Sequence, residues 1–155
     1  MTTIIGFNDE FNTLLNQLLN NNLSHSLLLT GNKGIGKNYF VTKLIEEYIK
    51  TKIKKDQINH HLSLLYNNSH PNIKFIKKET DEKTNKMKNF ITIDQIRKLN
   101  QFSFETSVID NFPKFILIDS ADDMNLNSSN ALLKILEEPN KNTYLFLISH
   151  QPSFL

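Results

Sequence analysis

The chain has 155 residues, which is enough for one domain with a hydrophobic core and too few for two. Its formal net charge of +2 is too small to indicate nucleic acid or a membrane surface as a partner. The absence of cysteine excludes disulfides, thiolate nucleophiles and cysteine-based zinc sites. The first residues carry neither a basic start nor a long apolar run. We therefore expect no signal peptide, no membrane helix and a cytoplasmic location.

The first third of the chain alternates between helical and extended patterns. Apolar residues at helical spacing predict a helix over 7–21. A short apolar run over 25–31 indicates a buried strand, and a second apolar stripe predicts a helix over 38–50. The order is therefore strand, glycine-rich loop, helix.

The stretch over 51–89 is rich in lysine and asparagine and is the hardest part to interpret. Within it, 72–78 alternates well enough to predict a strand, and the charged run that follows predicts a mobile surface loop. A helix is then predicted to start near Thr92, because Thr92 and Gln95 have the spacing of a capping box.

The signals become clearer after Pro113. A continuous apolar run over 114–119 predicts a central parallel strand that is buried on both faces. The segment 127–139 predicts a helix that ends at Pro139, with Asn125 or Asn127 as its cap. Its apolar stripe would be formed by Leu132, Leu133 and Leu136. A last buried strand over 144–149 completes a mostly parallel sheet with functional loops at one edge.

A phosphate-binding loop is the first motif with chemical meaning. Gly31, Gly36 and Lys37 fit the pattern G-x-x-x-x-G-K, with a strand before it and a helix after it. In such loops backbone N–H groups and the helix start face an anion, and the lysine neutralises terminal phosphates. The alternative is a glycine-rich turn with a surface lysine. The candidate loop residues are Gly31, Asn32, Lys33, Gly34, Ile35, Gly36, Lys37 and Asn38.

Two residues depart from an ATP-hydrolysing site. Asn38 stands where a serine or threonine hydroxyl normally helps to hold Mg²⁺, so we expect weak or metal-independent nucleotide binding at best. Asp119 ends its strand at the place of a Walker B acid, but Ser120 occupies the position of the glutamate that would orient water. Asp122 and Asp123 lie past the strand, where surface or capping roles are expected. We predict no catalytic residue and no ATPase activity from this chain alone.

Three segments carry a family resemblance: "HSLLLTGNKGIGK" (25–37), "FILIDSADDMN" (115–125) and above all "SNALLKILEEP" (129–139). Together they resemble the bacterial DNA polymerase III clamp loader, which belongs to the AAA+ class of P-loop proteins. The opening over 4–26, "SHPNI" (69–73) and "ITIDQIRKL" (91–99) match as well. The resemblance therefore covers essentially the whole chain. Among the subunits it is most similar to delta-prime, which commonly has a degraded nucleotide site.

The resemblance implies a three-layer α/β P-loop fold, with residues 1–155 as a truncated AAA+ core that lacks the lid, the last core strand and the collar. Without that strand, 26–30 is expected to form an exposed apolar edge. The implied function is a non-hydrolysing clamp-loader subunit that acts in DNA replication by packing against gamma/tau and delta. The sliding clamp and primer-template DNA would be indirect partners. The alternative is an active AAA+ ATPase of the gamma/tau kind.

Several positions are assigned through the resemblance. Ser149 and His150 are sensor-like, and the helix residues Asn130, Lys134 and Glu137 would face DNA or a neighbouring subunit, although a solvated helix face explains them almost as well. The lysine-rich pieces are expected to be solvated rather than DNA-binding. ATP or ADP is a possible weak ligand.

The chain also departs from the family. The family's four-cysteine zinc module is replaced by a stretch with His60, His61 and His70, which we expect to be surface histidines rather than a zinc site. Arg97 is the only arginine, and it lies outside the family's Ser-Arg-Cys segment. This chain is therefore not expected to supply the arginine that reaches a neighbouring subunit's ATP.

Overall fold

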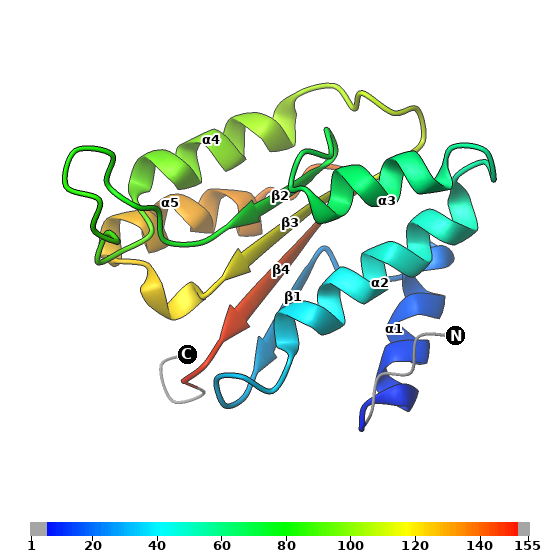
Figure 1. Cartoon of the computed structure of the whole chain (residues 1–155), viewed down its shortest axis with the longest axis horizontal. Helices are drawn as coiled ribbons and strands as arrows, with labels where there is room; N and C mark the ends of the chain where they lie inside the picture. Colours follow the sequence, from blue (N-terminus) through cyan, green and yellow to red (C-terminus); the bar gives the residue numbers. More distant parts are fainter. Residues whose placement is uncertain (1–5, 152–155) are drawn as a thin grey trace.

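The structure is a computed structural model that describes residues 6–151. Strands and helices alternate along the chain, as the sequence predicts (Figure 1). The elements are α1 (Asn8–Leu19), β1 (Ser26–Thr30), α2 (Lys37–Lys52), α3 (Ile58–Tyr66), β2 (Ile73–Ile76), α4 (Ile93–Phe104), β3 (Lys114–Asp119), the one-turn 3₁₀ helix η1 (Ala121–Asp123), α5 (Leu126–Glu137) and β4 (Thr143–Ser149). None of the helices within 6–151 is long and apolar enough to cross a bilayer.

The four strands form one parallel sheet in the order β1-β4-β3-β2. Helices α1, α2 and α3 cover one face of the sheet, and α4 and α5 cover the other (Figure 1). The predicted three-layer α/β fold is confirmed. Because all strands run the same way, their carboxyl ends meet at one edge, where the glycine loop and η1 also lie.

The core consists of two apolar clusters, one on each side of the sheet. Strand β3 contributes to both, since Phe115 and Leu117 point to one side and Ile116 and Ile118 to the other. All four side chains are at most 1% exposed, which confirms the predicted central strand. Burying them removes on the order of 25 cal/mol of unfavourable hydration per Å² of apolar surface. The same strand thereby fixes Asp119 at the end of a rigid support.

Strand β1 differs from the buried strand predicted for 25–31. It pairs with β4 through one edge, and among residues 6–151 no strand lies along its other edge. Leu27 and Leu29 therefore pack on the core beneath α1 and α2, while Leu28 on the opposite face remains 45% exposed. This matches the open apolar edge expected over 26–30.

The helix caps follow the local sequence closely, but the stripe of α5 does not. Thr92 and Gln95 form the predicted capping box, in which the Thr92 N–H donates to Gln95 Oε1 at 2.9 Å. Asn125, rather than Asn127, caps α5 by accepting the Ser128 N–H at 3.0 Å. Leu133 was wrongly placed in the stripe: it is 47% exposed, because the helix turns Leu132 and Ile135 into the core.

The stretch over 51–89 contains more structure than the sequence indicates. Helix α3 follows α2, and β2 forms inside the predicted 72–78 strand. The charged run after it is an exposed turn, in which a bridge joins Thr80 to Met87 and Asp81 accepts the Lys83 and Thr84 N–H groups at 2.9 Å each. Parallel pairing with β3 places the carboxyl end of β2 beside that of β3.

Candidate phosphate-binding site

The glycine loop joins β1 to α2 in a conformation that depends on two glycines. Gly34 and Gly36 have φ angles of 87° and 88°, in the left-handed region that other residues rarely adopt. A Cβ atom at either position would meet no heavy atom within 4 Å, so the requirement is conformational rather than steric. Gly36 is also the N-cap of α2, so the loop delivers its backbone directly to the start of a 16-residue helix.

Lys37 is folded onto the loop that precedes it. The side chain is only 7% exposed, and Nζ donates to the carbonyl oxygens of Gly31 and Asn32, at 2.7 Å each. These two bonds satisfy two of the three ammonium donors without any carboxylate. The positive charge of Lys37 therefore stays at the loop.

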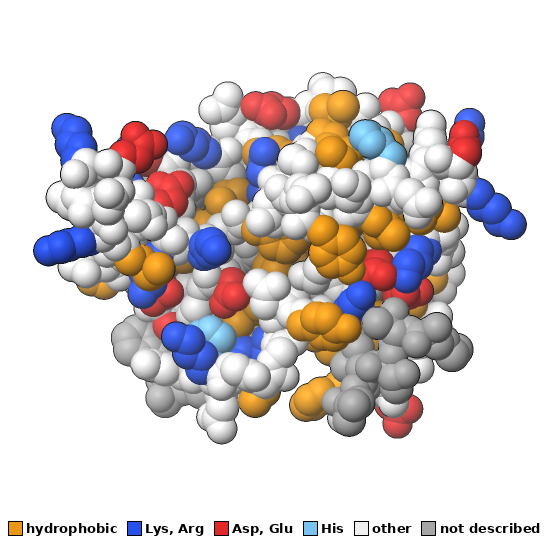
Figure 2. All heavy atoms as spheres, in the orientation of Figure 1, with side chains coloured by type: hydrophobic (Ala, Val, Ile, Leu, Met, Phe, Trp, Pro, Cys, Tyr) orange, Lys and Arg blue, Asp and Glu red, His pale blue; other side chains and the backbone are white. Residues whose placement is uncertain are grey.

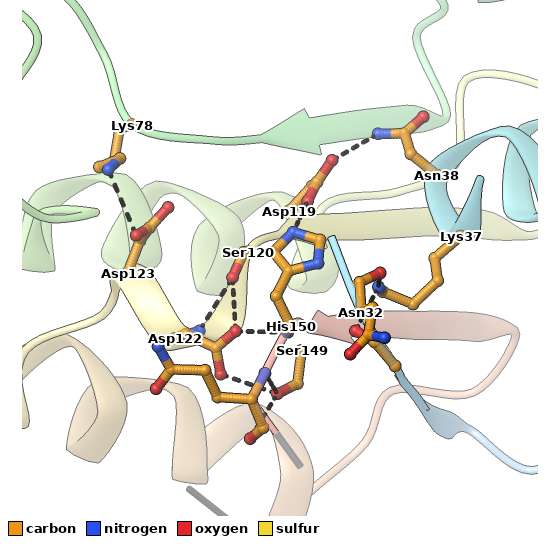
Figure 3. A network of polar contacts seen from close by, with 12 residues as sticks. Asn32, Lys37, Asn38, Lys78, Asp119, Ser120, Asp122, Asp123, Ser149 and His150 are labelled. Atoms are coloured by element: carbon orange, nitrogen blue, oxygen red, sulfur yellow. Dashed lines mark hydrogen bonds and ion pairs between the residues drawn. The ribbon is translucent and has the colours of Figure 1, made fainter. Parts of the chain in front are cut away.

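Asp119 is engaged by side chains from two other elements (Figure 3). Asn38 Nδ2 donates to Asp119 Oδ2 at 3.0 Å, across 81 positions of sequence. Thr42 Oγ1 lies 3.3 Å from Asn38 Oδ1 and donates to it, which fixes the orientation of the amide. His150 Nε2 lies 3.4 Å from the other carboxylate oxygen, Oδ1. Both oxygens of Asp119 thus face nitrogen atoms of the protein.

This arrangement does not fit the Mg²⁺ ion that P-loop enzymes use. Magnesium needs oxygen ligands in tight octahedral geometry, and in related sites a hydroxyl and the strand-end aspartate belong to that shell. Here Asn38 directs an N–H group at Asp119 Oδ2, whereas a P-loop enzyme has at this position a hydroxyl oxygen that binds the metal. Turning the amide over would set its carbonyl oxygen against the Asp119 carboxylate and lose that hydrogen bond.

Ser120 and Asp122 form a clamp between the ends of β3 and β4. Asp122 accepts hydrogen bonds from Ser120 Oγ at 2.9 Å, Ser149 Oγ at 2.7 Å and the His150 N–H at 2.5 Å. Burial by itself would raise the pKa of Asp122, but these three bonds outweigh it and lower the pKa below its usual range. Ser120 is 5% exposed and is committed to this clamp.

The sequence-predicted residues fall into two groups in space. The loop, Asp119, Ser120, Ser149 and His150 come together at the carboxyl edge of the sheet (Figure 3). Asn130, Lys134 and Glu137 do not join them, because they are exposed on α5. Asn130 and Lys134 line a separate groove of about 290 Å³, together with Arg97 of α4.

A cleft of about 900 Å³ opens in front of the loop and the strand ends. Figure 2 shows lysine, acidic and histidine side chains close together on this side of the molecule, at the lower left. Lys77 and Lys78, which belong to a lysine-rich piece expected to be solvated, line the cleft from the end of β2. Their place at the cleft follows from the parallel pairing of β2 with β3. Ile76 pairs with Ile118, so the next residue, Lys77, lies beside Asp119.

An apolar hollow of about 450 Å³ adjoins the cleft on the other side of the loop. Phe7 and Leu14 of the N-terminal region, Leu29 of β1 and Tyr39 and Phe40 of α2 line it. The two spaces share Gly36, Lys37 and Tyr39. A ligand with a flat apolar part and an anionic part would fit across the loop.

Of the three histidines expected at the surface, His60 is exposed, but His61 and His70 are not. His61 and His70 are 8% and 2% exposed, and His61 Nδ1 lies 3.0 Å from His70 Nε2. Burial, followed by the neighbouring histidines, lowers the pKa of His70 to about 4. Within residues 6–151, no group of three or more histidine, cysteine or acidic side chains is arranged to hold a metal.

The comparison with known proteins decides the family. The family model for "DNA polymerase III, delta subunit" matches residues 7–155. The chain belongs to this family. It is 42% identical over 92 residues to the DNA polymerase III subunit delta' of Pseudomonas aeruginosa, covering 59% of this chain and 26% of that protein. It is 28% identical over 144 residues to the DNA polymerase III subunit delta' of Bacillus subtilis, and the match covers 92% of this chain and 41% of that protein.

A solved structure extends the likeness to the fold. The crystal structure of a DNA polymerase III gamma subunit-related protein from Thermotoga maritima superposes with a TM-score of 0.67 at 20% identity. The match covers 95% of this chain and 41% of that one. The chain thus spans between a quarter and two fifths of the length of these delta-family relatives. The resemblance read from the sequence is confirmed at the level of family and fold.

Proposed function

We propose that this chain is a non-hydrolysing, delta-prime-like part of the DNA polymerase III clamp loader. It would act in DNA replication by packing against the gamma/tau and delta subunits, and so take part indirectly in placing the sliding clamp on primer-template DNA. Membership of the delta-subunit family supports a place in the clamp-loader complex. The names of the two relatives support the assignment to delta-prime.

One observation carries the non-hydrolysing part of the proposal. Asn38 and His150 place nitrogen atoms against both oxygens of Asp119, where an ATPase would hold its metal. Ser120, at the position of the water-orienting glutamate, has a neutral hydroxyl that donates to Asp122. A hydroxyl of this kind is a poor general base at neutral pH. Two separate requirements of hydrolysis are therefore unmet.

A working ATPase is the second candidate. The left-handed glycines, Lys37 and Asp119 favour it, because these parts of a P-loop site have the required local geometry. Phosphate release from ATP, measured with magnesium and compared with Lys37→Ala, separates the two candidates. Magnesium-dependent turnover that Lys37→Ala abolishes would establish the ATPase and end the non-hydrolysing proposal.

The scaffold role is tested by co-purification. The affinity-tagged chain is co-expressed with the gamma/tau and delta subunits of its source organism, and the complex is isolated by size exclusion. We expect the chain to enter the complex, and Lys37→Ala to enter it equally well, since packing does not depend on catalysis. A chain that stays out of the complex while remaining folded would contradict the proposal.

A further inference from the structure

We infer that the chain forms a symmetric dimer through the outer edge of β1. Two copies of Ser26–Thr30 pair antiparallel about a two-fold axis at Leu28, so the occupant of this edge is a second copy of the chain. The inference goes beyond the proposed function and does not depend on it, because a chain that stays monomeric in solution can still enter the clamp-loader complex.

Strand β1 has an outer edge that its own sequence does not protect. It is the first strand in the order β1-β4-β3-β2, and within the described part of the chain it pairs with β4 alone. Monomers commonly protect edge strands with a lysine, a proline, a bulge or a very short length. The other edge strand, β2, has four residues and contains Lys74, whereas β1 reads Ser-Leu-Leu-Leu-Thr and pairs with β4 in unbroken register. Strand β1 is therefore the edge open to another strand.

The outward-facing hydrogen-bonding groups of β1 are symmetric about Leu28. The Leu145 N–H donates to the His25 carbonyl oxygen at 2.7 Å, which starts the parallel ladder between β4 and β1. Since backbone groups alternate in direction along a strand, the N–H and C=O groups of Ser26, Leu28 and Thr30 face away from β4. In an antiparallel pair centred on Leu28, Leu28 exchanges two bonds with its copy, and Ser26 exchanges two with the partner's Thr30. About six hydrogen bonds result.

The side chains of the strand match in the same arrangement. Leu28 lies beside its copy, with about 5.5 Å between the Cα atoms, and each Ser26 hydroxyl lies beside the partner's Thr30 hydroxyl. All three side chains are exposed on the face of the sheet that carries α4 and α5. Leucine thus meets leucine, hydroxyl meets hydroxyl, and no charged pair has to be brought together.

Helix α5 extends the apolar surface along this edge. Leu136 of α5 and Ser26 of β1 line one small hollow, so α5 runs beside β1. The helix joins the end of β3 to the start of β4 and therefore runs opposite to the strands. One helical turn before Leu136, about 5.4 Å, brings Leu133 to the level of Leu28. Leu133 is 47% exposed, and in the dimer it faces the seam between the two β1 strands.

The size of the contact sets its strength. Five paired residues extend over about 17 Å, and one helix flanks them on the apolar face. A contact of this length buries less than the about 800 Å² per partner of a stable interface. We therefore expect a weak dimer, with a dissociation constant on the order of 100 μM.

Sedimentation velocity of the full chain between about 10 μM and about 1 mM tests the inference, with a shift from monomer to dimer expected. Leu28→Lys sets two ammonium groups side by side at the axis and should raise the dissociation constant about tenfold or more. Ser26→Pro removes an outward N–H group, at the first position of the strand where proline is tolerated, and should raise it about fivefold or more. Leu126→Lys is the matched control: Leu126 is 75% exposed at the start of α5, and this variant should dimerise like the parent.

Hydrogen exchange of single amides supplies a readout that does not depend on any variant. The Leu28 N–H should exchange more slowly as the chain concentration rises, whereas the Leu27 N–H, which faces β4, should be protected at every concentration. Circular dichroism of Leu28→Lys and Ser26→Pro should show the parent's fold, since both side chains are exposed.

Four results would overturn the inference. They are a monomer up to about 1 mM, assemblies larger than a dimer, a dimer that either β1 variant leaves unchanged, and a Leu28 amide that becomes protected only when a different protein is added. The last result would assign the β1 edge to that protein.

Discussion

Acidification is expected to destabilise the domain through the His61–His70 pair. His70 Nδ1 accepts the Asn72 N–H at 3.1 Å, so in the neutral ring the proton is on Nε2. That proton points at His61 Nδ1, 3.0 Å away, which must therefore be an acceptor. Protonating His70 would place a proton on Nδ1, against the Asn72 N–H group. Protonating His61 would place a proton on its Nδ1, against the proton on His70 Nε2. The buried pair fits only when both rings are neutral.

The sign and size of the effect follow from linkage. Burial lowers the pKa of His70 from 6.5 to about 4, so the unfolded chain binds a proton that the folded chain excludes. Stability is then complete above pH 6.5 and is lost as the pH falls toward 4. Because one pKa unit corresponds to about 1.4 kcal/mol, the loss between about pH 7.5 and about pH 5 is roughly 2 kcal/mol. His61, whose pKa is also lowered by burial, acts in the same direction.

Urea denaturation followed by circular dichroism at these two pH values measures the loss. His70→Gln should be less stable than the parent at the higher pH, but should lose about 2 kcal/mol less on acidification. His60→Gln is the matched control, since His60 is exposed on the same helix and is the last of the causes that lower the pKa of His70; it should keep most of the pH dependence of the parent. A parent chain that is equally stable at both pH values would refute the reasoning, as would an unchanged pH dependence in His70→Gln.

Three further substitutions test other parts of the structure. Glu46→Gln weakens contacts with Lys43, Lys50 and Tyr66 and should lower the free energy of unfolding by about 1–3 kcal/mol at neutral pH, with Glu47→Gln near neutral. Burial opposes ionisation of Glu46, but hydrogen bonding lowers the pKa of its carboxyl group to about 2. The contribution of Glu46 to the free energy of unfolding should therefore disappear only as the pH falls from 4.5 toward 2, and a loss near pH 6 would contradict this. Lys114→Met leaves the Phe102 and Glu105 carbonyl oxygens without their ammonium donor, so the free energy of unfolding from urea denaturation should fall by about 1–3 kcal/mol. An unchanged free energy would show that water replaces the ammonium group. Asn38→Thr frees Asp119 Oδ2 for a metal, so magnesium should strengthen ATP binding in this variant while phosphate release stays at background; clear turnover would show that Ser120 is no obstacle.

The elements that sequence reasoning predicted well are those specified by neighbouring residues. The capping box at Thr92, the apolar run of β3 and the glycine loop each depend on a few consecutive positions, and each has the expected conformation. The open edge of β1 was expected from the family resemblance, and β1 is an edge strand of the sheet. Local propensity and tertiary packing agree at these places, which is the condition for a reliable prediction.

The predictions that failed, and the contacts that were missed, depend on pairs far apart in the chain. Burial of His70 against Phe112 could not be anticipated from a lysine- and asparagine-rich stretch whose composition indicates a surface. The exposure of Leu133 depends on the rotational phase of α5 over the sheet. The contact between Asn38 and Asp119 joins α2 to β3 across 81 residues. The sequence identified Asn38 and Asp119 as candidate site residues, but it did not show that the Asn38 amide donates a hydrogen bond to Asp119.

That contact also explains how an aspartate can remain useful without a metal. An isolated carboxylate among the ends of three parallel strands would repel Asp122 and Asp123 nearby, and a cation normally removes this cost. In this chain the Asn38 amide and the His150 ring face Asp119, and they belong to α2 and to the end of β4. A metal ion can leave with its nucleotide, whereas a side-chain donor cannot. The contacts of Asn38 and His150 with Asp119 therefore tie the start of α2 and the end of β4 to the end of β3.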